Sequence, residues 1–154
     1  MKIHLSDEAA TIACAGRLKN ALPRNLNGIT VLLEGELGAG KSTFARGLIR
    51  ALGHDGPVPS PTYTLVEPYE LAAGTIYHVD LYRVADEEEL RFLGWNELDS
   101  GLRLVEWPDR APQLAESADL RMSLRYDGDG RQLEIVPLSM SGEQIVAEME
   151  DINA

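Results

Sequence analysis

Residues 35–42, which read GELGAGKS, carry the residue types and spacing of a loop that binds phosphate. They fit the pattern G-x-x-x-x-G-K-[ST], in which glycines let successive backbone N–H groups converge on phosphate oxygens. The lysine of such a pattern reaches the β- and γ-phosphates, and the hydroxyl after it binds Mg²⁺. The next residue, a threonine, either contacts the α-phosphate or is an ordinary residue of the first helical turn. The motif thus predicts a nucleotide and Mg²⁺ site that contains Gly35, Gly38, Gly40, Lys41 and Ser42, with Thr43 left open.

Two carboxylates end apolar runs downstream of this loop. Asp80 ends the run IYHVD, and Glu106 ends the run LRLVE. A phosphate loop needs a further carboxylate for its metal ion or for the attacking water, so both Asp80 and Glu106 are candidates for either role. His78 lies two residues before Asp80, so both side chains share one face of a strand. A strand histidine is more often a packed, hydrogen-bonded group, and we expect that role for His78.

The segment SPTYT, residues 60–64, follows the helix that should come after the loop. In nucleotide switches such a segment presents a threonine to the γ-phosphate, which makes Thr62 and Thr64 candidate switch or partner-contact residues. Its prolines equally suit a rigid connector, which the spacing alone favours. Trp107, between Glu106 and Pro108, is expected to be exposed. It either packs on the core or contacts a partner.

The hydrophobic pattern around these residues predicts one α/β domain over residues 1–154. The short β-branched run before the loop is typical of a buried parallel strand, and the spacing after it is typical of a helix. Four prolines between residues 55 and 68 exclude a helix or an inner strand there. We therefore expect a P-loop NTPase domain with a mostly parallel central sheet flanked by helices, and a C-terminal antiparallel β-hairpin. The expected elements are strands at 29–33, 75–83 and 102–106, a hairpin at 120–126 and 132–136, and helices from Asp7 (capped by Ser6), at 41–52, at 86–94 and near Ser141 and Gln144.

Composition restricts the partners and the compartment. The chain has 14 Lys and Arg against 25 Asp and Glu, a net charge of −11, whereas a protein that binds RNA or DNA by itself needs a basic surface. The start of the sequence has no apolar signal segment, and no run approaches the roughly 20 apolar residues of a membrane span. The single cysteine, Cys14, fits a reducing compartment and a buried place on a helix. We expect a cytoplasmic protein with no membrane contact, which meets nucleic acid only through other subunits.

Four segments carry a resemblance to a known family. GELGAGKST, SPTYTLVEPYE, HVDLYR and LVEWPD occur in this order across residues 35–109. Many unrelated proteins share the first, but the four together resemble the bacterial TsaE family, also called YjeE. Weaker similarity in LSDEAAT and GRQLEI extends the resemblance over nearly the whole chain. Glu36 and Ser42 stand where relatives often have Asp and Thr, and both changes keep the chemistry.

The resemblance implies a small Mg²⁺-dependent ATPase of tRNA threonylcarbamoyladenosine biosynthesis. Such proteins work with TsaD and TsaB subunits, and their ATP hydrolysis resets or activates the complex that transfers the threonylcarbamoyl group. The tRNA is held by those subunits. Residues matching Glu8 and Arg131 lie near the base or ribose of ATP in this family.

The resemblance also assigns roles to residues already singled out by their types. Residues 38–43 match the positions that bind ATP, and Ser42 and Glu106 match the Mg²⁺ site. Asp80 matches an aspartate needed for activity, and Trp107 matches a functional neighbour of the site.

Two other functional classes share the phosphate loop. A small-molecule kinase would need a lid with catalytic arginines and a pocket for the acceptor, and the proline-rich segment 60–64 makes a poor lid. A nucleotide-gated binding module with negligible hydrolysis would have the same motifs, because an ATPase that depends on a partner also turns over slowly alone. ATP turnover with and without partner subunits distinguishes the three.

Overall fold

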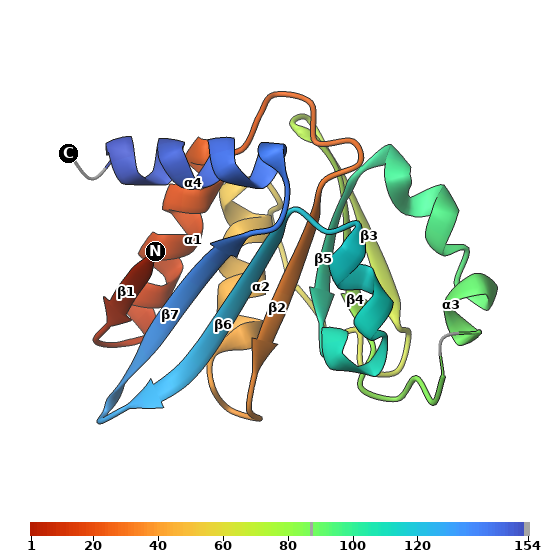
Figure 1. The fold of residues 1–154 in the computed structure, drawn as a ribbon, viewed down its shortest axis with the longest axis horizontal. Coiled ribbons are helices and arrows are strands. Elements are labelled where there is room, and N and C mark those ends of the chain that lie inside the picture. Colours follow the sequence, from red (N-terminus) through yellow and green to blue (C-terminus); the bar gives the residue numbers. More distant parts are fainter. Residues whose placement is uncertain (87, 153–154) are drawn as a thin grey trace.

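The computed structural model describes residues 1–86 and 88–152. They form a mixed sheet of seven strands flanked by helices (Figure 1). In chain order the elements are β1 (Lys2–Leu5), α1 (Glu8–Ala21), β2 (Thr30–Gly35), α2 (Lys41–Ala51), β3 (Val66–Leu71), β4 (Gly74–Asp80), α3 (Glu89–Phe92), the 3₁₀ turn η1 (Trp95–Ser100), β5 (Leu102–Glu106), the 3₁₀ turns η2 (Pro108–Arg110) and η3 (Pro112–Glu116), β6 (Leu120–Asp127), β7 (Gly130–Pro137) and α4 (Met140–Ile152).

The strand order β1-β7-β6-β2-β5-β4-β3 brings strands distant in sequence together. The four inner strands β6, β2, β5 and β4 are parallel, and the strands outside them are antiparallel to their neighbours. Glu106 of β5 pairs with Leu33 of β2 on one side and with Asp80 of β4 on the other. The carboxyl ends of β2, β4 and β5 therefore meet at one edge, where ligands of α/β sheets gather.

Two apolar cores lie on opposite faces of the sheet. Helices α1, α2 and α4 cover one face, where Phe44, Leu48 and Leu104 are fully buried. Segments α3, η1 and η3 cover the other face of β2, β5 and β4 (Figure 1). No helix in the described ranges is both long enough and apolar enough to cross a membrane.

The structure confirms the α/β class, the strand 102–106 and the C-terminal hairpin. The sequence did not predict β1 or β3, which are the two outer strands. Strand β3 contains Pro68, which an edge strand tolerates because one side of it needs no N–H donor. Strand β4 ends at Asp80 instead of residue 83, because the Asp80 carboxylate accepts the N–H of Tyr82 at 2.8 Å and turns the chain.

The predicted start of α2 at Lys41 is confirmed, but the predicted caps of α1 and α4 are wrong by one or two positions. Asp7, and not Ser6, caps α1 by accepting a backbone N–H at 2.8 Å. Ser139, and not Ser141, accepts a backbone N–H at the start of α4 at 3.0 Å. Several cap-type residues precede each helix, so spacing alone cannot choose among them.

The predicted helix 86–94 is also wrong in length. It contains only the single turn α3 among its described residues, and residue 87 lies outside them. Gly94 then takes a left-handed conformation, with φ of 69°, and ends that turn before η1 begins.

Asp119 joins the start of β6 to two other elements. This buried carboxylate accepts the N–H of Thr30 at 2.8 Å and the hydroxyl of Ser139 at 2.6 Å. The approach is close: a Cβ at Gly142 would lie 1.9 Å from the Asp119 carbonyl oxygen. The base of β2, which carries the glycine loop at its other end, is therefore anchored to the start of α4.

We expect Asp119→Ala to lower the free energy of unfolding by about 2–4 kcal/mol, because hydrogen bonds to a charged group contribute about 1.5–3 kcal/mol each and the buried N–H of Thr30 would lose its acceptor. Asp119→Asn should lose less, since its amide oxygen still accepts one bond. Urea unfolding measures both. The exposed Asp55 provides the control as Asp55→Ala, and an Asp119→Ala protein as stable as that control would contradict the prediction.

Candidate functional site

The glycine loop, residues 35–42, connects β2 to α2. Gly38 and Gly40 have φ of 81° and 107°, values that side chains disfavour. A Cβ at Gly35 would lie 2.8 Å from the carbonyl oxygen of Leu124 in β6. The loop can follow this path only because glycines occupy these positions.

The loop ends in the amino terminus of α2. The first hydrogen bond within this helix runs from the Phe44 N–H to the Gly40 carbonyl, at 2.9 Å. The N–H groups of residues 41–43 precede that bond, and together with the helix dipole they can bind an anion.

Lys41 is a buried cation at this helix end, with 5% of its surface exposed. Its ammonium donates to the Gly35 carbonyl at 2.5 Å and lies 3.4 Å from the centroid of the Trp107 ring. No ion pair among the described residues includes Lys41. Burial lowers the pKa of Lys41, although the charges of Glu106, Asp80 and Asp109 oppose the shift. A buried ammonium without a directly bonded carboxylate is poised to bind an anion.

Glu106 lies at the end of β5 and is also buried. Its Oε2 atom is 2.5 Å from the Nε2 atom of His78, which is 2% exposed. His78 is thus the packed, hydrogen-bonded group that the sequence led us to expect. Its partner, a residue of the predicted site, was not anticipated.

Asp80 lies beside Glu106 at the end of β4 and is tied to the segment 60–64. The hydroxyl of Thr62 donates to its Oδ2 atom at 3.1 Å, and the hydroxyls of Ser60 and Thr62 are 2.8 Å apart. Its other oxygen, Oδ1, accepts the N–H of Tyr82. Both carboxylate oxygens of Asp80 are therefore bonded, one of them by a side chain of a loop.

A cleft of about 300 Å³ brings most of the predicted residues together. We expected Trp107 to be exposed, but it is half-buried. Its indole packs under Lys41 and beside Tyr82, with 5.0 Å between the ring centroids of Trp107 and Tyr82. Thr64 is exposed and does not line the cleft, and Ala39 has its side chain in the core. The predicted residues that line the cleft are Gly38, Gly40, Lys41, Ser42, Thr43, Thr62, Asp80, Glu106 and Trp107.

A second hollow, of about 180 Å³, shares part of the glycine loop with the cleft. It is lined by Glu8 of α1 and Arg131 of β7, so these two predicted residues also meet at the loop. Arg131 donates to the Gly38 carbonyl at 3.2 Å, and its guanidinium stacks over the ring of Tyr126 at 4.3 Å. Tyr126 in turn donates to the carbonyl of Leu37 at 2.9 Å. The tip of the β6–β7 hairpin therefore holds the glycine loop.

One residue, Tyr126, and one contact, that of His78 with Glu106, were not predicted from the sequence. Tyr126 was read only as part of an alternating strand, and no signal in the sequence aligned that hairpin with the loop. The contact of His78 with Glu106 could have been predicted, since the spacing of His78 and Asp80 already placed both on the face that meets the end of β5.

The donor set fits Mg²⁺ held together with phosphates. Among the described residues, no group of three or more His, Cys, Asp or Glu side chains could hold a metal ion alone. Mg²⁺ in nucleotide sites typically takes one or two protein ligands and completes its shell with phosphate and water oxygens. Ser42 and Glu106, both on the cleft, are ligands of that kind.

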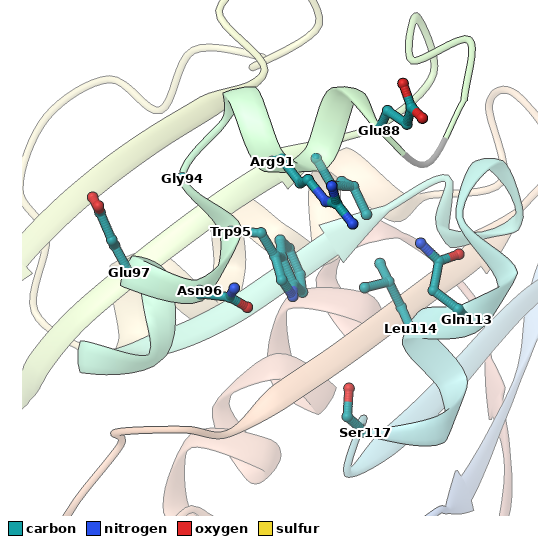
Figure 2. A pocket seen from close by; sticks show the side chains of 10 residues that line it. Glu88, Arg91, Gly94, Trp95, Asn96, Glu97, Gln113, Leu114 and Ser117 are labelled. Atoms are coloured by element: carbon teal, nitrogen blue, oxygen red, sulfur yellow. The ribbon is translucent and has the colours of Figure 1, made fainter.

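A separate cavity of about 620 Å³ lies between α3, η1 and η3, where Trp95, Gln113 and Leu114 line it (Figure 2). It contains none of the predicted site residues. It also lacks a glycine loop and a buried cation, so the smaller cleft is the candidate site.

The fold and the site define a single-domain α/β protein, with a glycine loop and two strand-end carboxylates at one edge of a mixed sheet. A profile of the family described as threonylcarbamoyl adenosine biosynthesis protein TsaE matches residues 5–133, and the chain belongs to this family. A Haemophilus influenzae relative is 42% identical over 121 residues, which is 77% of each chain. A Nostoc relative is 35% identical over 152 residues, 95% of this chain and 91% of that one. Both are named tRNA threonylcarbamoyladenosine biosynthesis protein TsaE.

The fold is also found in a solved structure. The crystal structure of Bacillus subtilis YdiB has a TM-score of 0.79 to this chain at 26% identity. The match covers 100% of this chain and 96% of YdiB.

The buried Lys41 predicts a pH dependence of stability. The unfolded lysine keeps its proton up to a pKa of 10.5, whereas the folded one releases it at lower pH because burial lowers its pKa. Between the two values the unfolded state binds more protons, so stability rises with pH. Relative to Lys41→Met, the wild-type protein should gain stability as pH rises from neutral toward 10.5. Thermal unfolding across this range measures the difference, and Lys19→Met, at an exposed lysine, is the control. Parallel pH profiles for wild type and Lys41→Met would be inconsistent with a buried charge.

Proposed function

We propose that this chain binds ATP with Mg²⁺ and hydrolyses it in tRNA threonylcarbamoyladenosine biosynthesis, the process named in its relatives. The observation that carries the proposal is the cleft itself. A buried, unpaired ammonium on Lys41 lies at a helix amino terminus, and the carboxylates of Asp80 and Glu106 line the same 300 Å³ space. Membership of the TsaE family supports the same conclusion.

The loop and Lys41 bind the triphosphate. The N–H groups at the start of α2 and the ammonium of Lys41 supply the positive charge, since backbone dipoles and a fixed cation need no reorganisation. Ser42 and Glu106 would hold Mg²⁺, which would neutralise charge on the phosphates. The base and ribose fit the adjoining hollow between Glu8 and Arg131.

Asp80 orients the water that attacks the γ-phosphorus. Its Oδ2 atom accepts the Thr62 hydroxyl, so the segment 60–64 sets the direction from which that oxygen can accept a second hydrogen bond, from water. Hydrolysis is therefore coupled to the position of this segment. Slow turnover by the isolated chain and faster turnover with a partner follow from this coupling.

The partners we propose are subunits of the TsaD and TsaB type, which the chain resets or activates between transfers. The net charge of −11 disfavours direct tRNA binding, so those subunits hold the tRNA. Leu37, which lines the cleft, and Tyr63, which follows the lining residue Thr62, are 79% and 78% exposed. Large apolar side chains at such exposure suit a protein contact that also includes Thr62, Thr64 and Trp107.

Substitutions of the two carboxylates should have different effects on ATP binding and hydrolysis. Glu106→Gln should lose the tightening of ATP binding by Mg²⁺, whereas Asp80→Asn should bind ATP·Mg²⁺ normally and hydrolyse it about 100-fold more slowly. Calorimetry and phosphate release measure these effects. Asp109→Asn is the matched control, because Asp109 is a nearby carboxylate that does not line the cleft. Equal loss of ATP binding in both variants would refute this division of roles. A wild-type protein that does not bind ATP would refute the proposed function.

Assembly with the partners should depend on the nucleotide. A ligand shifts an equilibrium only by its different affinity for the two states, so ATP should promote assembly with a TsaD–TsaB pair more than ADP does. The pair should in turn raise ATP turnover. Tyr63→Ala should weaken assembly about fivefold, whereas Phe92→Ala, at the 89% exposed Phe92 on α3, should not. Pull-down and turnover assays with purified subunits test this, and assembly indifferent to nucleotide would contradict it.

A further inference from the structure

His78 is buried beneath the cleft, where it contacts Glu106, and has no part in the roles described above. The two side chains are 3% and 4% exposed, and their contact is the 2.5 Å bond between Nε2 and Oε2. The same face of β4 carries Ile76, which is fully buried, then His78 and then Asp80. His78 therefore stands at the boundary between the apolar core and the site.

Simple packing does not account for a histidine at this boundary. In the sheet, His78 pairs with Leu104, and both Leu104 and Ile76 are apolar. The Nδ1 atom of His78 is buried and has no hydrogen-bond partner among the described residues. A buried polar atom without a partner is unfavourable, and an aliphatic residue would avoid it. The imidazole ring is explained by the hydrogen bond between its other nitrogen, Nε2, and Glu106.

The bond also determines which proton the ring carries. For an ionised Glu106 to accept, the Nε2 atom must carry the proton, and Nδ1 is then the bare, unpartnered acceptor. Glu106 lines the cleft, and its second oxygen, Oε1, has no hydrogen-bond partner among the described residues. The Oε2 atom of Glu106 is thus held by His78, whereas its Oε1 atom is available to groups in the cleft.

We propose that His78 is a positioning residue for Glu106: its Nε2–H fixes Oε2 and so presents Oε1 to Mg²⁺ in the cleft. This inference rests on the proposed function, because it concerns the ligand that holds the nucleotide's metal ion. Ligands of metals are commonly oriented by a hydrogen bond from a second residue, and loss of that residue weakens metal binding about 10–100-fold. The two carboxylates of the site then differ in support, since Glu106 is held by a core strand and Asp80 by a loop hydroxyl.

The test measures how much Mg²⁺ tightens ATP binding, by calorimetry with and without the ion, in four variants. His78→Leu keeps an apolar side chain but no donor, and should reduce the tightening about tenfold. His78→Gln can place an amide N–H at a similar reach and should restore most of it, whereas the shorter His78→Asn should not. Ile76→Val is the matched control, because it loosens the same face of β4 at a position that pairs with Leu102 and not with Glu106. Affinity for ATP without Mg²⁺ should stay within about twofold in all four, since His78 does not line the cleft.

Thermal unfolding establishes that each variant is folded, and the comparison of His78→Gln with His78→Asn decides the question if His78→Leu does not fold. Equal Mg²⁺ tightening in wild type, His78→Leu and His78→Asn would overturn the inference alone. So would equal loss in His78→Gln and His78→Asn, or a loss of the same size in Ile76→Val. A wild-type protein whose ATP binding does not respond to Mg²⁺ would overturn the proposed function, and the inference with it.

Discussion

A cation taken out of water must be compensated, and the site of this protein is arranged around one. The ammonium of Lys41 is buried at the end of β2, where the carbonyl of Gly35 accepts its hydrogen bond and the indole of Trp107 lies against it. Neither contact neutralises the charge, so the cleft retains a positive centre that an anion can complete. Glu106 and Asp80 lie near enough to oppose the fall in the pKa of Lys41 without pairing with it. The glycine loop, the amino terminus of α2 and the carboxyl ends of the strands together hold this group in place.

Local pattern predicted the inner part of the fold well, because a buried strand, a glycine turn and an amphipathic helix each have a signal within about ten residues. The strand 102–106 and the hairpin are confirmed for that reason. The outer strands β1 and β3 were missed, since edge strands are short and tolerate polar residues and Pro68. The helix caps were misplaced because Ser6 and Asp7 both suit the role, and only the folded chain shows which one accepts the N–H.

The site shows the same division between local and long-range information. Residues 38–43 form one motif, and Asp80 and Glu106 end strands, so sequence could place them near one another. The hold of Tyr126 on the carbonyl of Leu37 joins positions 89 residues apart, and no local pattern encodes which strand stands beside β2. The contact of His78 with Glu106, 28 residues apart, was predictable only once β4 and β5 were known to be neighbours in register.

The strand order has a consequence for how the chain acquires its structure during synthesis. Strand β2 lies at the centre of the sheet, yet one of its two neighbours, β6, follows all the other parallel strands in the chain. Strand β1, the first to emerge, pairs with β7, so it must wait for a partner about 130 residues later. Contacts so distant in sequence form slowly because the intervening chain must first be ordered. The glycine loop, which contacts Leu124, Tyr126 and Arg131, therefore reaches its final shape only after residues 124–131 have been synthesised.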